Sequence, residues 1–453
     1  MRGERGASRV SSILWIFAIF DAGALLVLAA ELLPARPSRA RNPGGARRDA
    51  DVWVAIVVVS YAVQLALTAY AAYAQPGVPV RARVFPLPLA GPVPAHRDAV
   101  VAAMLVLAAV QSYALLCVYR GNASRRAVVA GAASLLALSF ASPAMISADA
   151  YAYAGDALLG RLAYAPPAVP FSLAFAAIDR WWHPLPPTPY GPLWLGVAWF
   201  ATAALPTLTG KLLALRALGG VAYVATALLL RALGLPWRTV AIAAVNPGLA
   251  YEYVGSAHND LTGIVPIVAA ALYARRAPIV AALLLLAGAL VKLPFAIFGW
   301  PVLAGVRDRR LRATLLVAVP VAAVALTFAA GGSGFAQAMV PHLTSSPLMR
   351  VLTGAVGAIV TIAMAIAAFG GRRLRSTVLL APLAPAYTCA WYFAWGLPYA
   401  IARRRVLGYL LIAFPLAAIL LEVKFMTPWT LFGIVPAVAA WQILAMRTRQ
   451  APS

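Results

Sequence analysis

Apolar segments long enough to cross a lipid bilayer recur along this chain from one end to the other. A membrane-spanning helix needs about 17 to 25 predominantly apolar residues, and the polar loops between the segments are too short to form a separate soluble domain. We therefore predict an all-α integral membrane protein, a single polytopic domain over 1–446 with roughly 13–16 membrane segments and a cytoplasmic tail at 447–453. The predicted segments lie at about 10–33, 52–74, 99–118, 127–146, 193–208, 213–234, 239–255, 261–274, 278–291, 294–305, 313–331, 351–370, 377–390, 392–402, 406–422 and 428–446.

The composition agrees with a membrane protein and argues against a nucleic-acid-binding one. Of the residues, 63% are hydrophobic and 11% are charged, whereas soluble proteins average about 25% charged residues. The formal net charge is +24, but the arginines are divided among short loops instead of forming one basic stripe. Membrane topology and contact with anionic membrane lipids account for such charges. Cys117 and Cys389 both lie in apolar runs, so neither a disulfide framework nor a zinc motif is indicated.

The basic loops predict which end of each segment faces the cytoplasm, because loops rich in Lys and Arg stay on that side. Arg125 and Arg126 precede the segment 127–146. Residues 147–190 therefore follow it on the opposite side, as a large extracytoplasmic loop after the fourth segment. The same logic places a second external loop at 332–349.

Two parts of this topology stay open. Between residue 190 and the basic pair at 275–276, the number of predicted segments has the wrong parity for the sequence SAHND (256–260) to lie outside. One of the three segments between them is therefore re-entrant or misplaced. The first segment, 10–33, is long for a signal peptide and lacks a small-residue cleavage site, so we expect it to be retained, although this puts a basic N-terminus outside.

Four carboxylates are difficult to explain as solvated surface charges: Asp149, Asp156, Glu252 and Asp260. An acid within or at the edge of a membrane segment costs roughly 2.5–3.5 kcal/mol on insertion scales, so such acids usually face a cavity and serve a function. Asp149 stands where an apolar segment ends, and a partly buried carboxylate there can act as a general base. The alternative is a helix cap, because Ser147 and Asp149 are both capping types.

The stretch AVNPGLAYEYVGSAHNDLTGI (244–264) concentrates polar residues in an apolar region. Its Asn-Pro and Gly-Ser pairs indicate a broken helix, which is tolerated at membrane depth where it lines a wet cavity. His258 and Asp260 are metal-ligand types, but without a third ligand at a diagnostic spacing they give only a weak metal signal. Hydrogen bonds to a polar substrate are the favoured role, and a helix cap by Asn259 or Asp260 is the alternative.

Two further features each have one structural and one functional interpretation. Lys292 follows an apolar run and either extends its ammonium group to the membrane surface or binds an anion such as a lipid phosphate. Trp391, Tyr392 and Trp395 form either an interfacial aromatic belt or a stacking platform for a sugar or isoprenoid.

Taken in order, several of these stretches resemble the GT-C superfamily of polyprenyl-phosphate-sugar-dependent glycosyltransferases. They are most similar to the α-1,6-mannosyltransferases that use polyprenyl phosphomannose. The resemblance covers about 140–400, although the chain reads YAPPAVPF where the family has an Asn-Pro-Tyr motif. The motifs are SADAYAYAGDALLGRLAYAPPAVPF (147–171), TPYGPLW (188–194), NPGLAYEYVGSAHND (246–260), VKLP (291–294) and WYFAWGLP (391–398).

The resemblance implies a GT-C-type bundle and an inverting transfer of a hexose, expected to be mannose, from a polyprenyl-phosphate donor to an envelope glycan or glycolipid acceptor. Asp149 matches the family's catalytic acid, the general base that deprotonates the acceptor hydroxyl. Asp156 would shape the same pocket or serve as the alternative base. The expected substrate-binding residues are His258, Asn259 and Asp260 near the donor sugar and phosphate, Lys292 near the leaving phosphate, and Tyr151, Tyr153, Tyr190, Glu252, Trp391 and Tyr392.

The resemblance also implies a multi-pass protein of the cell (plasma) membrane with an extracytoplasmic active site. We predict no required cofactor, although some relatives use a divalent cation and the sequence does not decide this. One rival interpretation is a transporter or flippase of lipid-linked sugars, which also needs broken helices and intramembrane acids, but no internal repeat is evident. Another is a structural subunit of an envelope-synthesis complex, which would make the acids incidental.

Overall fold

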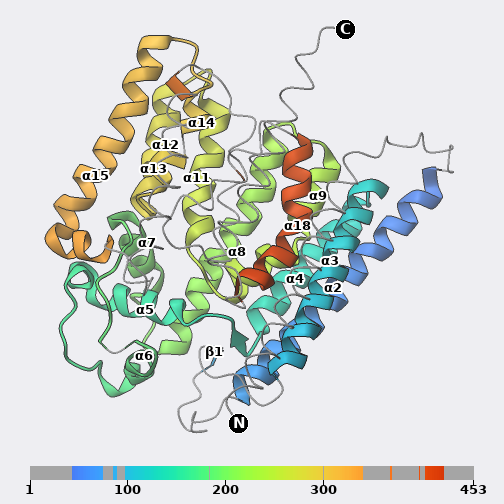
Figure 1. Ribbon diagram of the computed structural model, residues 1–453, viewed down its shortest axis with the longest axis horizontal. Coiled ribbons are helices and arrows are strands. Elements are labelled where there is room, and N and C mark those ends of the chain that lie inside the picture. The colour runs from blue at the N-terminus through green and yellow to red at the C-terminus, as the bar shows by residue number, and fades with distance from the viewer. Residues whose placement is uncertain are drawn as a thin grey trace, which may run out of the picture. The chain divides into compact units, whose positions relative to one another are not determined.

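A computed structural model describes most of the chain between residues 43 and 339, together with a later helix. The described residues are 43–74, 85–88, 97–182, 184–298, 300–339, 368–369, 397 and 404–422. The chain divides into two compact units, 1–47 and 48–453, and the arrangement given below is that of the second (Figure 1). The predicted first segment 10–33, the aromatic residues Trp391 and Tyr392, and the tail 447–453 lie outside the described residues.

Helices make up almost all of the described secondary structure, which confirms the predicted all-α class. Two short strands, β1 (Leu87–Pro88) and β2 (Ala144–Met145), pair in parallel. The longer helices are α2 (Pro43–Tyr73), α3 (Arg97–Gly121), α4 (Arg125–Ala141), α5 (Asp149–Leu159), α7 (Pro192–Thr202), α8 (Leu208–Ala232), α9 (Trp237–Ala244), α11 (Asp260–Tyr273), α12 (Pro278–Val291), α15 (Arg309–Met339) and α18 (Arg404–Glu422). The short helices are η2 (Gly160–Tyr164), η3 (Leu173–Phe175), α6 (Ala176–Trp181), α10 (Pro247–Leu249), η4 (Ala250–Gly255), α13 (Phe295–Phe298) and α14 (Trp300–Leu303).

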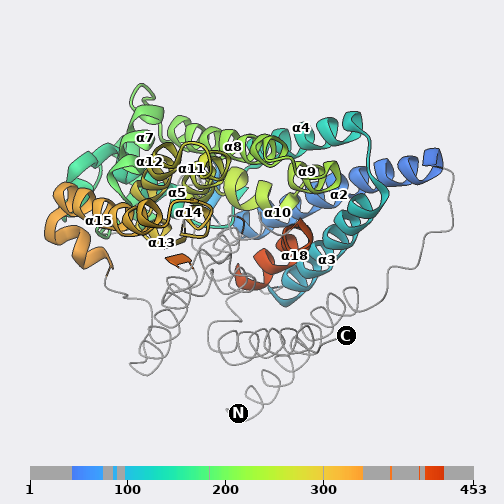
Figure 2. The ribbon, with the colours of Figure 1, turned by 90° about the horizontal axis from the view of Figure 1, so that it is seen from above.

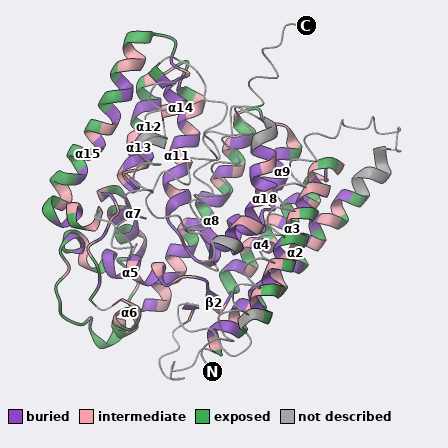
Figure 3. Ribbon diagram, in the orientation of Figure 1, coloured by how far each residue is buried: buried purple, intermediate pink, exposed green. Residues whose placement is uncertain are grey.

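Four helices in the described ranges are long and apolar enough to cross a membrane, as a polytopic membrane protein requires. They carry outward-facing apolar side chains that a soluble protein would bury, such as Val59, 64% exposed, and Val321, 60% exposed. Figure 3 shows this exposed band along α2 and α15. The four spans are Asp49–Tyr73, Ala99–Gly121, Leu208–Ala232 and Arg309–Ala338.

Helix α7 accounts for the parity conflict in the predicted topology. It has 11 residues, about 16 Å of helix, whereas the hydrocarbon core is about 30 Å thick. With α7 not crossing, two passes, one through α8 and one from α9 to η4, put residues 256–260 at the same end as the loop 147–190. Helix α11 follows these residues and leads back to the basic pair at 275–276. The separation of 3.7 Å between His258 Nε2 and Asp149 Oδ2 agrees with this placement.

Basic residues gather at the opposite end of these helices. The Trp237 indole Nε1 donates to the Ala123 carbonyl oxygen at 2.8 Å, and the Arg125 guanidinium lies 5.8 Å from the Trp237 ring centroid. The Arg238 guanidinium lies 4.9 Å from the Tyr119 ring centroid. The basic loops after α3 and after α8 therefore share one end, and the acids of interest share the other.

Helix α8 belongs to two buried clusters and lies between two groups of helices. Leu208 and Leu212 in its first half pack with aromatic residues of α5 and α7. Tyr223 and Leu230 in its second half pack with α2, α3, α4, α9 and α18. Figures 1 and 2 show α5 and α7 on one side of α8, and α2, α3, α4 and α18 on the other.

The predicted second external loop, 332–349, is only partly described. Helix α15 continues to Met339 beyond a kink at Gly332, where φ is 54°. Residues 340–349 lie outside the described residues, so the loop stays a prediction.

A glycine in the middle of α8 permits the close approach of the segment that bears Glu252. A Cβ atom at Gly219 would lie 1.7 Å from the Tyr253 carbonyl oxygen, whereas one at Gly220 would find its nearest neighbour, Leu136 Cδ2, at 3.7 Å. Tyr253 belongs to η4, a π-helical turn. Only the first of these adjacent glycines is therefore required by packing.

The pair provides a matched test of this contact. We expect Gly219→Ala to lower the unfolding temperature, because the new methyl group displaces η4, and Gly220→Ala to keep or raise it, because alanine is favoured over glycine in a helix by about 1 kcal/mol. Thermal unfolding of the two purified variants in detergent measures the difference. Equal stability of the two variants would show that α8 and η4 do not pack as described.

Candidate active site

Chain breaks at the ends of apolar helices bring three of the four predicted acids together. Asp149 is the first residue of α5, Glu252 lies in the π-helical turn η4, and Asp260 begins α11. The side chain of Asp149 is 20% exposed, whereas those of Glu252 and Asp260 are fully buried. Asp149 is thus the most accessible acid of this group.

His258 lies between two of these acids. Its Nε2 is 3.7 Å from Asp149 Oδ2, and its Nδ1 is 3.2 Å from Glu252 Oε2. The His258 backbone N–H donates to the Glu252 carbonyl oxygen at 3.1 Å. One imidazole nitrogen therefore faces each carboxyl group.

Lys292 pairs with the third acid, as neither of its sequence interpretations foresaw. Its Nζ donates to Asp260 Oδ1 at 2.8 Å and lies 5.5 Å from the Tyr190 ring centroid. Lys292 is thus a buried cation beside an aromatic ring, and a buried cation is suited to binding an anion. The pair also joins the start of α11 to the end of α12.

Aromatic side chains form a wall beside the charged groups. The ring centroids of Tyr153 and Tyr190 are 5.2 Å apart, and those of Tyr153 and Trp194 are 5.3 Å apart. The Tyr190 hydroxyl donates to the Tyr153 hydroxyl at 3.2 Å. Asp149 and Asp260 both act electrostatically on Tyr153 and Tyr190, so the wall and the acids belong to one site.

The helix-capping interpretations of Asp149 and Asn259 find no support in the described geometry. The cap position of α5 is Ala148, and its first helical N–H, that of Asp149, donates to Ser147 Oγ. Asn259 occupies the cap position of α11 but makes no side-chain capping bond. The two polar side-chain atoms of Asn259, Oδ1 and Nδ2, are buried and make no hydrogen bond to the described residues. Buried polar groups in native proteins are nearly always hydrogen-bonded, so this exception needs an explanation.

No three His, Cys, Asp or Glu side chains in the described ranges are arranged to hold a metal ion. The prediction that no cofactor is required stays a prediction, as does the role of Trp391 and Tyr392.

Arg216 was missed by the sequence analysis, although it organises the site. It is fully buried and donates to the carbonyl oxygens of Phe140 at 3.1 Å, Ser142 at 2.7 Å, Ala144 at 3.0 Å and Gly255 at 2.9 Å. One guanidinium thus joins the segment leading to Asp149 with the end of η4. The detectable signal was a lone charged residue inside an apolar segment, which usually marks a specific role.

A second link between the same segments is shorter. The Ile146 backbone N–H donates to Ser256 Oγ at 3.2 Å. Together with Arg216, this bond holds the chain just before Asp149 against the chain just before His258.

Asp156 lies on the same helix as Asp149 but in a different environment. It is buried, and its Oδ2 accepts a hydrogen bond from Thr188 Oγ1 at 2.9 Å. Burial raises the pKa of Asp156 to about 8, although the Thr188 hydrogen bond opposes this shift. The carboxyl is therefore mostly protonated at neutral pH, which favours a pocket-shaping role over that of an alternative base. Tyr151, also predicted, donates through its hydroxyl to the Pro86 carbonyl oxygen at 2.8 Å.

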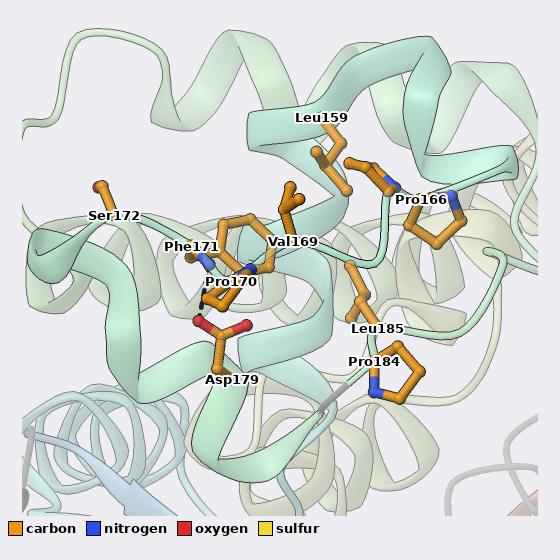
Figure 4. A pocket seen from close by; sticks show the side chains of 10 residues that line it. Leu159, Pro166, Val169, Pro170, Phe171, Ser172, Asp179, Pro184 and Leu185 are labelled. Carbon is orange, nitrogen blue, oxygen red and sulfur yellow. Dashed lines mark hydrogen bonds between the residues drawn. The ribbon is translucent and has the colours of Figure 1, made fainter.

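A cavity of about 220 Å³ lies in the loop between α5 and α7 (Figure 4). Proline and aliphatic side chains line most of it, and its carboxylate, Asp179, accepts a hydrogen bond from the Phe171 N–H at 2.7 Å. None of the predicted substrate-binding residues lines this cavity. We therefore place the site at the acid and histidine cluster.

These observations define a polytopic helical membrane protein with a site suited to acid–base chemistry. Comparison with known families gives the particular assignment: residues 61–306 match the family described as alpha-(1->6)-mannopyranosyltransferase, N-terminal domain. The match covers more than half of the chain, so the protein belongs to this family. It is a glycosyltransferase that transfers mannosyl groups, which confirms the predicted enzyme class and disfavours the transporter interpretation. Neither a curated protein nor a solved structure matches the chain significantly.

Replacing Arg216 tests the link between the two segments. Arg216→Lys keeps the charge but cannot reach four carbonyl groups, and a buried group left unsatisfied costs about 1–3 kcal/mol. We expect faster hydrogen exchange in 140–149 and 252–258, with a lower unfolding temperature. Arg231→Lys, at the exposed end of α8, is the matched control and should change neither. Unchanged exchange in Arg216→Lys would exclude the organising role.

Asp156 predicts a specific dependence of stability on pH. Because its pKa is higher in the folded protein, at about 8, than the usual 3.8, its contribution is fully present below pH 4. That contribution is lost as the pH rises through 8. Asp156→Asn should therefore weaken the fall in unfolding temperature between pH 4 and 8, and Asp179→Asn in the same loop should not. An identical pH dependence in wild type and Asp156→Asn would contradict the raised pKa.

Proposed function

We propose that this protein transfers a mannosyl group from a polyprenyl-phosphate donor to an envelope glycan or glycolipid, with inversion at the anomeric carbon and Asp149 as the general base. The observation that carries this proposal is the accessibility of Asp149. Its side chain is 20% exposed beside a buried polar cluster, whereas Glu252 and Asp260 are fully buried. A base that meets an incoming hydroxyl must be reachable.

The proposed reaction is a single displacement. The acceptor hydroxyl oxygen forms a bond to the anomeric carbon while the bond from that carbon to the phosphate oxygen breaks. The hydroxyl proton passes to Asp149, and the bonding electron pair leaves with the polyprenyl phosphate. Because the departing phosphate is a stable anion, one general base is sufficient and no second carboxyl group is needed as an acid.

Lys292 supports the donor side of this proposal. A buried cation is suited to a phosphate, and the Lys292 ammonium group, 8% exposed, bonds through one donor to Asp260. Asp260 fixes its position, and the ammonium group supplies the positive charge that would face the leaving phosphate.

The sugar-binding side is supported by Asn259 and the aromatic wall. A buried amide offers both donors and an acceptor to sugar hydroxyls, and that of Asn259 makes no hydrogen bond to the described residues. The partly exposed ring of Tyr190, backed by the buried rings of Tyr153 and Trp194, supplies apolar surface for a sugar ring. Glu252 and His258 complete the polar surroundings.

The proposed location is the plasma membrane, with the site on the extracytoplasmic side. The acids lie at the end of the helices opposite the basic loops around Arg125 and Arg238, and basic loops remain in the cytoplasm. A lipid-linked donor would lie in the bilayer with its polar sugar at this end.

Asp149→Asn tests the proposal in membranes supplied with polyprenyl phosphate carrying radiolabelled mannose and with membrane glycolipids. Removing a general base should lower transfer by at least about 100-fold without unfolding the protein. The control is Asp308→Asn, because Asp308 is exposed at the start of α15 and its Oδ1 accepts from the Arg310 and Leu311 N–H groups, which an amide oxygen retains.

Two results would contradict the proposal. Full activity in Asp149→Asn would exclude the base. Movement of the intact lipid-linked sugar across the bilayer, without transfer by the wild type, would favour a transporter.

A further inference from the structure

The π-helical turn η4 and the residues after it place His258 in an unusual backbone setting. Ala257 adopts a left-handed conformation with φ of 58°, which is unfavourable for a residue with a Cβ atom. The reversal folds the chain back, so that the His258 N–H reaches the Glu252 carbonyl oxygen at 3.1 Å. π-Helical turns and strained residues are concentrated at functional sites.

The result of this geometry is a line of three titratable side chains. Asp149 Oδ2 lies 3.7 Å from His258 Nε2, and His258 Nδ1 lies 3.2 Å from Glu252 Oε2. Asp149 reaches solvent, whereas His258 and Glu252 are fully buried. The three side chains therefore extend from an accessible carboxylate into the protein interior.

We propose that His258 accepts the proton from Asp149 while Glu252 stabilises the resulting imidazolium, so that His258 is a positioning and proton-accepting residue and not a ligand of the donor sugar. This inference rests on the proposed function, because it requires Asp149 to be the base. In the resting site His258 is neutral, with its proton on Nδ1 facing the Glu252 carboxylate and with Nε2 facing Asp149.

The proposed relay moves one proton from Asp149 to His258 and back. Asp149 accepts the acceptor hydroxyl proton during transfer and passes it to His258 Nε2, which regenerates the Asp149 carboxylate. The resulting imidazolium carries both protons, and the Glu252 carboxylate stabilises its charge through Nδ1–H. The proton returns through Asp149 to solvent after the product leaves, so no net change remains on the protein.

Burial and orientation favour the relay over direct contact with the donor. Each imidazole nitrogen faces a carboxyl group, at 3.7 Å for Nε2 and 3.2 Å for Nδ1, so a sugar hydroxyl would have to enter between the imidazole and one of these groups. The charged groups that face the imidazole are Asp149, Glu252, Asp260 and Lys292.

The test is the pH dependence of mannosyl transfer by His258→Gln, measured as kcat and KM for polyprenyl phosphomannose with membrane glycolipids. Glutamine keeps hydrogen-bonding atoms but does not titrate. The wild type should lose activity toward acid pH as His258 becomes protonated, at a pH below the ordinary histidine value of about 6.5 because burial lowers the pKa of His258. His258→Gln should lack this acid limb and should lose about 100-fold in kcat with little change in KM, as for an interaction made in the transition state.

A second variant shifts the same limb without removing it. Glu252→Gln removes the carboxyl group that faces Nδ1 and would stabilise the imidazolium through Nδ1–H, so the acid limb should move to lower pH. Asp308→Asn should leave the profile unchanged. This variant keeps the relay testable if His258→Gln does not fold, as judged by its elution and unfolding temperature in detergent.

Some results would contradict the relay, and others would contradict the proposed function. An acid limb retained by His258→Gln, or an increase in KM with kcat unchanged, overturns the relay. A limb that does not move in Glu252→Gln overturns it as well. Failure of the proposed function is distinct from these results, because it shows as a wild type without transfer or as an active Asp149→Asn variant.

Discussion

One buried arginine joins the two breaks in the helical structure that make the active site. A helix that ends inside a membrane protein leaves carbonyl groups without partners, and a guanidinium removed from water needs acceptors for its donors. Arg216 meets both requirements at once by bonding to the carbonyls at the end of α4, beyond it, and at the end of η4. Asp149 follows one of these two segments in the chain and His258 follows the other, so Arg216, together with the bond from the Ile146 N–H to Ser256 Oγ, holds the two residues close to each other.

The four acids at and near the candidate site differ in exposure and in the groups that they contact. Asp149 reaches the surface, Asp260 is neutralised by Lys292, and Glu252 lies behind His258. Asp156 is separated from them by its bond to Thr188 and carries a pKa of about 8. Four acids that are equivalent by composition thus occupy an accessible position, an ion pair with a cation, an interior position beside a histidine and a hydrogen-bonded structural position. The family assignment as a mannosyltransferase agrees with the proposed roles of Asp149 as a base and of Lys292 as a phosphate-binding cation.

The membrane explains why the site lies at the ends of the helices. Polar backbone is tolerated at membrane depth only where it is enclosed by protein or lines a cavity. The short helix α7 and the π-helical turn η4 are such interruptions, and both lie against α8. Gly219 of α8 permits the close contact with η4. A lipid-linked donor and a polar acceptor can meet where apolar helices give way to this enclosed polar region.

The sequence by itself determined the class, most of the helices and the chemical types at the site. Apolar length and periodicity depend on local residues, so the predicted segment 278–291 has the same limits as α12. The acids at 149, 252 and 260 were recognisable because charges are costly in such surroundings. Only the tertiary structure decided that α7 is too short to cross, that Lys292 pairs with Asp260, and that Arg216 closes the two breaks. These are contacts between residues far apart in the chain, and local pattern carries no information on which distant partner satisfies a buried polar group.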